Sequence, residues 1–155
     1  WLVAIAVFLL DQGTKYWILN HLEVWESVPL LPGWLHLTLV QNEGAAFGLF
    51  ANWTWLFILV TLAAVLLVLF FYRRILALDW QFQLALALAL GGAVGNLLDR
   101  IRFGHVVDFI DLLVWPVFNV ADMAIIAGVV LLGYKILFLP PENESGVLPK
   151  QKTDN

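Results

Sequence analysis

The segment GNLLDRIRFGHVVDFIDLLVWPVFNVAD, residues 95–122, separates two long apolar runs and decides how the rest of the chain is organised. Only 13% of all residues are charged, and this segment is rich in ionisable ones. They are Asp99, Arg100, Arg102, His105, Asp108, Asp111 and Asp122. Such groups are costly inside a bilayer unless they are paired or reach water, so a cluster of them indicates a functional site.

The composition indicates a membrane protein. Of the 155 residues, 62% are hydrophobic, eight are Trp, and the mean hydropathy is +0.88, whereas about half of the residues of a soluble domain are apolar. The net charge of −4, with no basic stripe interleaved with aromatics, argues against nucleic acid as a partner. The absence of cysteine excludes disulfides, a thiol nucleophile and thiolate metal sites.

Apolar segments long enough to span a bilayer predict four transmembrane helices, since one span needs about 20 residues. We expect them at about 1–19, 52–72, 81–98 and 118–139, in one membrane domain over 1–139 that is followed by a polar tail, 140–155. The first segment has no basic n-region or small-residue cleavage site, so we expect a helix there and not a cleaved signal peptide. Because no initiator Met is present, we expect that this helix is incomplete.

A different pattern lies between the first two predicted helices. Residues 34–41 alternate between apolar and polar side chains, which is typical of a half-buried strand. The fold class that we predict is therefore an all-α membrane protein with four transmembrane helices and a small extracytoplasmic β element at about 24–50. A turn of small residues is expected at 42–48.

Basic residues predict the orientation in the membrane. With four spans both termini lie on one side, together with Arg73, Arg74, Lys150 and Lys152. An excess of Lys and Arg marks the cytoplasmic side. The loop that carries Asp108 is then expected at the outer face.

The residue types favour acid–base chemistry by carboxylates. Ser27 and Ser145 lie outside any G-x-S-x-G motif, and the three histidines lack the spacing of metal ligands. Two adjacent carboxylates cannot both ionise cheaply, so one can act as a base while the other donates a proton. Asp108 can pair with Asp122, or with Asp111 if the intervening segment is helical, or the aspartates can be separate interfacial charges; the spacing leaves these alternatives open.

Several polar residues are spaced to share a helix face. Asp11 and Lys15 predict an ion pair, whose simpler interpretation is an anchor for a helix end. Asn96 shares a face with Arg100, which could bind a substrate carbonyl or balance charge, and Asn119 could orient Asp122. The simpler alternative for Asp99 and Arg100 is a charge pair at a helix terminus.

Motifs in register along the chain carry a resemblance to a known family. They are Asp11-Gln12-x-Thr14-Lys15, Asn42-x-Gly44-Ala45-Ala46-Phe47-Gly48, Gly95-Asn96-Leu97-Leu98-Asp99-Arg100, Val106-Val107-Asp108-Phe109 and Phe118-Asn119-Val120-Ala121-Asp122. In this order they resemble the signature motifs of lipoprotein signal peptidase, also called signal peptidase II. The resemblance implies a bacterial inner-membrane aspartyl endopeptidase. Its substrates would be diacylglyceryl-modified prolipoproteins, cut on the N-terminal side of the lipidated cysteine without a cofactor or metal.

The resemblance also implies a role for each matching residue. Asp108 and Asp122 would form the catalytic dyad. The site would be lined by Asn42, Asn96, Arg100 and Asn119, and supported by Asp11, Lys15 and Asp99. The family has an extracytoplasmic β cradle, which agrees with the predicted strand. We further expect contact with membrane lipids, inhibition by globomycin bound between the aspartates, and a monomer.

Two features depart from the family pattern. Glu43 stands where a small residue is expected, and the interval from Asp108 to Asp122 is short for the family. The rival interpretation, an ion- or proton-coupled transporter, predicts ionisable groups at the bilayer midplane and inverted repeats. The sequence instead gathers its charges at one face. A purely structural membrane subunit leaves the outer-face aspartates unexplained.

Overall fold

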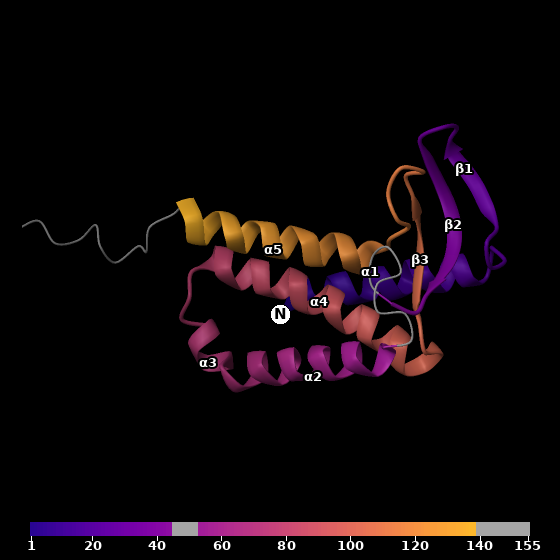
Figure 1. Cartoon of the computed structure of the whole chain (residues 1–155). Helices are drawn as coiled ribbons and strands as arrows, with labels where there is room; N and C mark the ends of the chain where they lie inside the picture. The colour runs from indigo at the N-terminus through magenta and orange to yellow at the C-terminus, as the bar shows by residue number, and fades with distance from the viewer. Residues whose placement is uncertain (45–52, 139–155) are drawn as a thin grey trace, which may run out of the picture.

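The computed structural model describes residues 1–44 and 53–138, and Figure 1 shows their arrangement. The elements are α1 (Leu2–Leu19), β1 (Ser27–Leu31), β2 (Leu35–Asn42), α2 (Thr54–Phe70), α3 (Tyr72–Ile75), α4 (Trp80–Phe103), β3 (Val106–Asp111) and α5 (Val120–Phe138). The long helices run side by side, and the sheet stands across one end of them (Figure 1).

Within the described residues, three helices have the length and hydropathy needed to cross a bilayer: α1, α4 and α5. The helix predicted at 52–72 is divided. Its apolar part, α2, has 17 residues, and the chain turns at Phe71 into the four-residue α3. The length of α2 therefore leaves the span predicted at 52–72, and with it the count of four, without confirmation.

The third predicted helix continues further than expected. The prediction places its end at about 98, but α4 extends to Phe103. Its charged last turns are already outside the apolar run, and the helix stops only where Gly104 adopts a left-handed conformation with φ 81°. Glycine at this position ends helices without steric cost. Asp99 and Arg100 are consequently held on a rigid helix.

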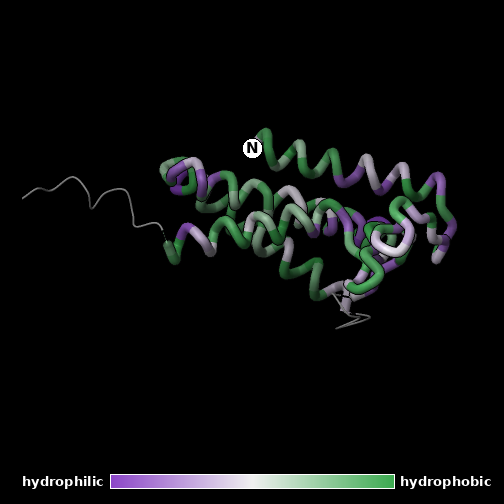
Figure 2. The backbone as a smooth tube through the Cα atoms, turned by 90° about the horizontal axis from the view of Figure 1, so that it is seen from above, coloured by the Kyte–Doolittle hydropathy of each residue, from purple (hydrophilic) through white to green (hydrophobic). Residues whose placement is uncertain are grey.

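Glycines on α4 allow its two neighbours to approach closely. A Cβ on Gly91 would lie 2.6 Å from the carbonyl oxygen of Ala4 in α1, and one on Gly92 would collide with the carbonyl of Ala121 in α5. Small residues at the contact face are typical of closely packed membrane helices. Figure 2 shows hydrophobic colour along much of these helices, with hydrophilic residues gathered mainly toward the sheet.

The sheet is antiparallel, with strand order β1-β2-β3. The β1–β2 hairpin confirms the β element predicted after the first helix. The turn predicted at 42–48 lies mostly outside the described residues.

β3 contradicts the prediction that this β element lies only between the first two helices. Residues 106–109 are all buried, so β3 is covered on both faces and shows no alternation that would mark it as a strand. Val107 and Phe109 pack with Ile18 of α1 and Leu39 of β2 to form the core beneath the sheet.

Candidate active site

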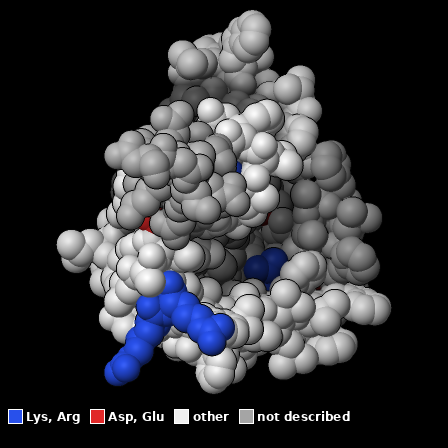
Figure 3. Space-filling view, turned by 90° about the vertical axis from the view of Figure 1, so that its left-hand side faces the viewer, with Lys and Arg blue, Asp and Glu red and all other residues white. Residues whose placement is uncertain are grey.

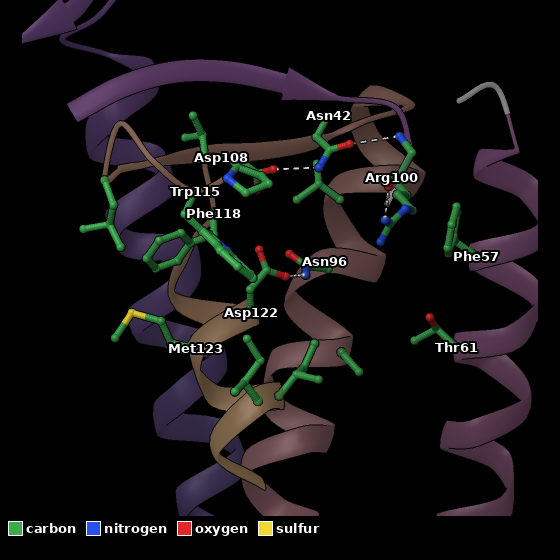
Figure 4. Close-up of a pocket in the computed structure, with 18 residues that line it drawn as sticks. Asn42, Phe57, Thr61, Asn96, Arg100, Asp108, Trp115, Phe118, Asp122 and Met123 are labelled. Carbon is green, nitrogen blue, oxygen red and sulfur yellow. Dashed lines mark hydrogen bonds between the residues drawn. The ribbon is translucent and has the colours of Figure 1, made fainter. Parts of the chain in front are cut away.

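A cavity of about 670 Å³ lies where α2, α4, α5 and the sheet meet. Asp108 enters it from β3 and Asp122 from the first turn of α5 (Figure 4). The helix predicted at 118–139 begins at Val120 and not at 118, so Asp122 lies in its first turn. Most of the remaining lining is apolar, including Phe57, Phe118 and Met123.

Asp108 is almost fully buried, with 1% of its surface exposed. Its Oδ2 accepts a hydrogen bond from Asn42 Nδ2 at 2.8 Å, and its Oδ1 accepts one from Asn119 Nδ2 at 2.6 Å. Burial, and next the negative charge of Asp122, raise the pKa of Asp108 to about 7 against the lowering effect of these two hydrogen bonds. Asp108 can therefore retain a proton near neutral pH.

Asp122 is held by amide groups as well. Its Oδ1 accepts from Asn96 Nδ2 at 2.7 Å, and its Oδ2 accepts from the backbone N–H of Asn119 at 3.3 Å. In return the N–H of Asp122 donates to Asn119 Oδ1 at 2.9 Å, so the pair forms a reciprocal cap at the start of α5. The orienting role predicted for Asn119 thus has a geometric basis.

Asp111 lies away from this pair. The segment from Asp108 to Asp111 is a strand and not a helix, so side chains three residues apart point to opposite faces. The carboxylate of Asp111 accepts instead from Thr38 Oγ1 at 2.7 Å and from the N–H of Leu113 at 2.8 Å. The structure brings Asp122, and not Asp111, to the cavity that Asp108 lines.

Lys15 lies beneath the site and is 2% exposed. Its Nζ forms ion pairs with Asp11 at 2.9 Å and Asp99 at 2.8 Å, and donates to Asn96 Oδ1 at 2.9 Å. The ion pair predicted from spacing is confirmed, whereas its interpretation as an anchor for a helix end is wrong. The bond from Lys15 also fixes Asn96 so that its amide nitrogen faces Asp122.

Asp11 connects α1 to α5, and Asp99 connects α4 to β3. Asp11 Oδ1 accepts from the N–H of Ala121 at 2.9 Å, which ties the middle of α1 to the first turn of α5. Asp99 accepts from the N–H of Val107 at 3.1 Å, which ties α4 to β3. Because Asp99 pairs with Lys15, the alternative of a terminal pair with Arg100 is wrong.

Gln12 belongs to this network, and we assigned it no role from the sequence. Its Nε2 donates to Asp11, to the carbonyl of Gly95 and to Asp99, at 3.1 to 3.2 Å. A polar residue beside Asp11 within an apolar helix was the available signal. The sequence carries no such signal for the apolar residues that line the cavity, because nothing distinguishes them from the other residues of the same apolar segments.

Arg100 borders the cavity from α4. Its Nη2 donates to the carbonyl of Gly44 at 3.1 Å, and its guanidinium carbon lies 4.7 Å from the ring centre of Phe57. Within the described residues its buried Nε has no hydrogen-bond partner. Arg100 thus offers a donor and a positive charge beside the aspartates. Glu43 is exposed and does not line this cavity.

Comparison with known proteins places these residues in context. Residues 3–138 match the family described as Signal peptidase (SPase) II. A lipoprotein signal peptidase of Moorella thermoacetica is 48% identical, covering 96% of this chain and 97% of that protein. One of Halothermothrix orenii is 41% identical, covering 94% of this chain and 98% of that protein. A bacterial membrane enzyme solved by the in meso method at 2.3 Å resolution superposes with a TM-score of 0.84 at 30% identity, over 96% of this chain and 93% of that one.

Proposed function

The chain belongs to the signal peptidase II family, and on that basis we propose that Asp108 and Asp122 are its catalytic dyad. It is a membrane-embedded bacterial peptidase that cleaves the signal peptide from prolipoproteins. The transporter alternative is therefore set aside. The observation that carries the dyad is the position of both carboxylates in one cavity, with Asn119 hydrogen-bonded to each.

In the proposed reaction Asp122 is ionised and Asp108 is protonated. Asp122 takes a proton from water as the water oxygen attacks the scissile carbonyl, while Asp108 donates its proton to the carbonyl oxygen. The tetrahedral intermediate then collapses: one of its hydroxyl groups returns a proton to Asp108 as the carbon–nitrogen bond breaks, and the departing amide nitrogen receives the proton held by Asp122. The raised pKa of Asp108 supports its role as the acid.

The neighbouring polar residues act on this pair or on the substrate. Asn42, Asn96 and Asn119 hold the carboxylates through the hydrogen bonds described above. Arg100 lines the cavity, and the N–H groups of its guanidinium are proposed to donate to a carbonyl of the substrate.

Asp11, Lys15 and Asp99 support the site without touching the substrate. Together they connect α1 to α4, α5 and β3 directly below the dyad. Their charges are paired inside the protein, which is what buried ionisable groups require in order to be stable.

We propose four spans, α1, α2, α4 and α5, in a single domain over 1–139. Both termini would be cytoplasmic and the dyad near the outer face. Arg73 and Arg74 of α3 support this orientation, because they lie at the end of the helices away from the sheet. Figure 3 views this end, where Lys and Arg side chains protrude. Basic residues are enriched on the cytoplasmic side of membrane proteins.

The substrate is proposed to be a diacylglyceryl-modified prolipoprotein, cut before its lipidated cysteine. The apolar part of the cavity, between Thr61 of α2 and Ile126 of α5, suits acyl chains that stay in the bilayer. Globomycin is proposed to occupy the same cavity between Asp108 and Asp122. A monomer is sufficient, because one chain supplies both aspartates.

The test compares two substrates with purified enzyme. One is a diacylglyceryl-modified prolipoprotein, and its matched control carries serine in place of the modified cysteine. We expect a loss of signal-peptide mass from the first substrate only, and less product when globomycin is added. Equal cleavage of both would contradict the proposed recognition of lipid, and cleavage of neither by folded enzyme would contradict the function.

A further inference from the structure

A short loop, residues 112–117, forms one wall of the cavity. Leu112, Trp115, Pro116 and Val117 all line it, and Figure 4 shows Trp115 beside the two aspartates. The tip of the loop, Val114, is 92% exposed. The loop thus extends from the cavity that holds Asp108 and Asp122 to the protein surface, and the side chains that it places along the cavity wall are apolar.

The two ends of this loop are held differently. At its far end, Phe118 exchanges backbone hydrogen bonds with Ile110 at 2.8 and 3.1 Å. At its near end, the side chain of Asp111 makes the connection: Oδ1 accepts from the N–H of Leu113, and Oδ2 accepts from Thr38 Oγ1 in β2. Asp111 therefore links the start of the loop to the middle strand of the sheet.

Leu113 shows that this connection maintains an unfavourable conformation. Its φ of 65° is in the left-handed region, which a leucine rarely adopts. The hydrogen bond from its own N–H to Asp111 offsets that cost. Without Asp111, we expect Leu113 to return to an ordinary conformation, which would change the path of the cavity wall.

We propose that Asp111 is a positioning residue that, together with Thr38, holds loop 112–117 as the wall against which the apolar part of the prolipoprotein binds. The inference rests on the proposed function, because it assigns that cavity to the substrate. Asp111 points to the opposite face of β3 from Asp108, so it acts on binding and leaves the proton transfer unchanged.

Steady-state kinetics on the lipidated prolipoprotein separate these effects. Asp111→Ala removes the hydrogen bonds with both Leu113 and Thr38 and should raise KM about tenfold, with kcat nearly unchanged. Asp111→Asn should have the KM of the wild type. The amide oxygen of the asparagine can still accept from the N–H of Leu113, and its amide nitrogen can donate to the hydroxyl of Thr38. Thr38→Val should have an intermediate effect, since the bond to Leu113 remains.

Ser27→Ala provides the matched control. Ser27 Oγ hydrogen-bonds to Thr38 Oγ1 at 2.9 Å, so this variant removes a bond to the same hydroxyl but leaves the bond between Thr38 and Asp111. Its KM should equal that of the wild type. A KM of Asp111→Ala equal to that of the wild type would overturn the proposal, as would a changed pH profile in that variant, which would make Asp111 part of the acid–base pair.

A second measurement does not depend on catalysis. The chain has no cysteine, so Val114→Cys gives a single site for a nitroxide label. Electron paramagnetic resonance should show a more mobile label when Asp111→Ala or Thr38→Val is added, and wild-type mobility with Asp111→Asn or Ser27→Ala. Unchanged mobility in Asp111→Ala would overturn the positioning role even if the enzyme cleaves prolipoproteins. Increased mobility in an enzyme that cleaves none would leave the positioning role standing and contradict the proposed function instead.

Discussion

Asn119 and Asp122 cap each other at the start of α5, and the same Asn119 side chain also donates to Asp108. A single asparagine therefore sets the helix start and the orientation of both carboxylates. This arrangement makes the two roles of Asn119 separable by mutation.

Asn119→Ser should keep the cap and lose the donor to Asp108. Serine is a good N-cap residue, so we expect a small change in thermal stability in detergent. Activity should fall by roughly a hundredfold, as is typical when a reacting group is misplaced. Asn119→Ala, which loses both functions, is the comparison. Wild-type activity in Asn119→Ser would show that the bond to Asp108 is dispensable.

Lys15→Met should strongly destabilise the protein. The variant leaves the charges of Asp11 and Asp99 buried without their partner, which costs about 3–5 kcal/mol in proteins. Thermal unfolding in detergent would measure the loss. Lys135→Met is the control, because its ion pair with Asp79 is partly exposed and should matter less. Equal losses in the two variants would argue against a buried network under the site.

The pH dependence of cleavage should reflect Asp108. Since the pKa of Asp108 is raised from 3.8 to about 7, activity should fall as the pH rises through about 7 and the acid loses its proton. The folded state binds this proton more tightly than the unfolded state. The associated stability is therefore present below pH 3.8 and lost as the pH rises through about 7.

Asn42→Ala tests the assignment of this pH limb. The hydrogen bond from Asn42 lowers the pKa of Asp108, so its removal should move the alkaline limb to higher pH. Gln41→Ala, the exposed neighbour on the same strand, should leave the limb unchanged. A shift to lower pH in Asn42→Ala would contradict the assignment to Asp108.

Gly92→Ala should destabilise the packing of α4 on α5, because the added Cβ would collide with the backbone carbonyl of Ala121. Gly133→Ala is the matched control, since no atom of the described residues outside its own stretch of helix backbone lies within 4 Å of its Cβ position. Alanine is favoured over glycine in helices by about 1 kcal/mol, so this control should be neutral or slightly stabilising. Thermal unfolding in detergent would measure the stability of both variants. Similar stability of Gly92→Ala and Gly133→Ala would contradict the close contact between α4 and α5.

Local patterns predicted much of the fold. The apolar runs located the long helices, and the alternation at 34–41 located β2. The end of α4 and the existence of β3 could not be read in the same way. Charged residues indicate where apolar sequence ends but not where a helix ends, and a strand buried on both faces has no alternation.

In the site, as in the fold, relationships between residues close in sequence were predictable and those between distant segments were not. Spacing correctly joined Asp11 to Lys15 and Asn119 to Asp122, since both pairs are local along the chain. Spacing alone could not decide between Asp111 and Asp122, because that choice depends on β3 being a strand. The loop that lines the cavity required the three-dimensional arrangement of distant segments.

The most direct test of the dyad follows the mass of a diacylglyceryl-modified prolipoprotein during incubation with wild type, Asp108→Asn, Asp122→Asn and Asp111→Asn. Each variant should first be shown to be folded in detergent. We expect the signal peptide to be lost with wild type and Asp111→Asn, and the substrate to stay intact with the other two. Turnover by folded Asp108→Asn or Asp122→Asn would contradict the assignment of these residues as the catalytic pair.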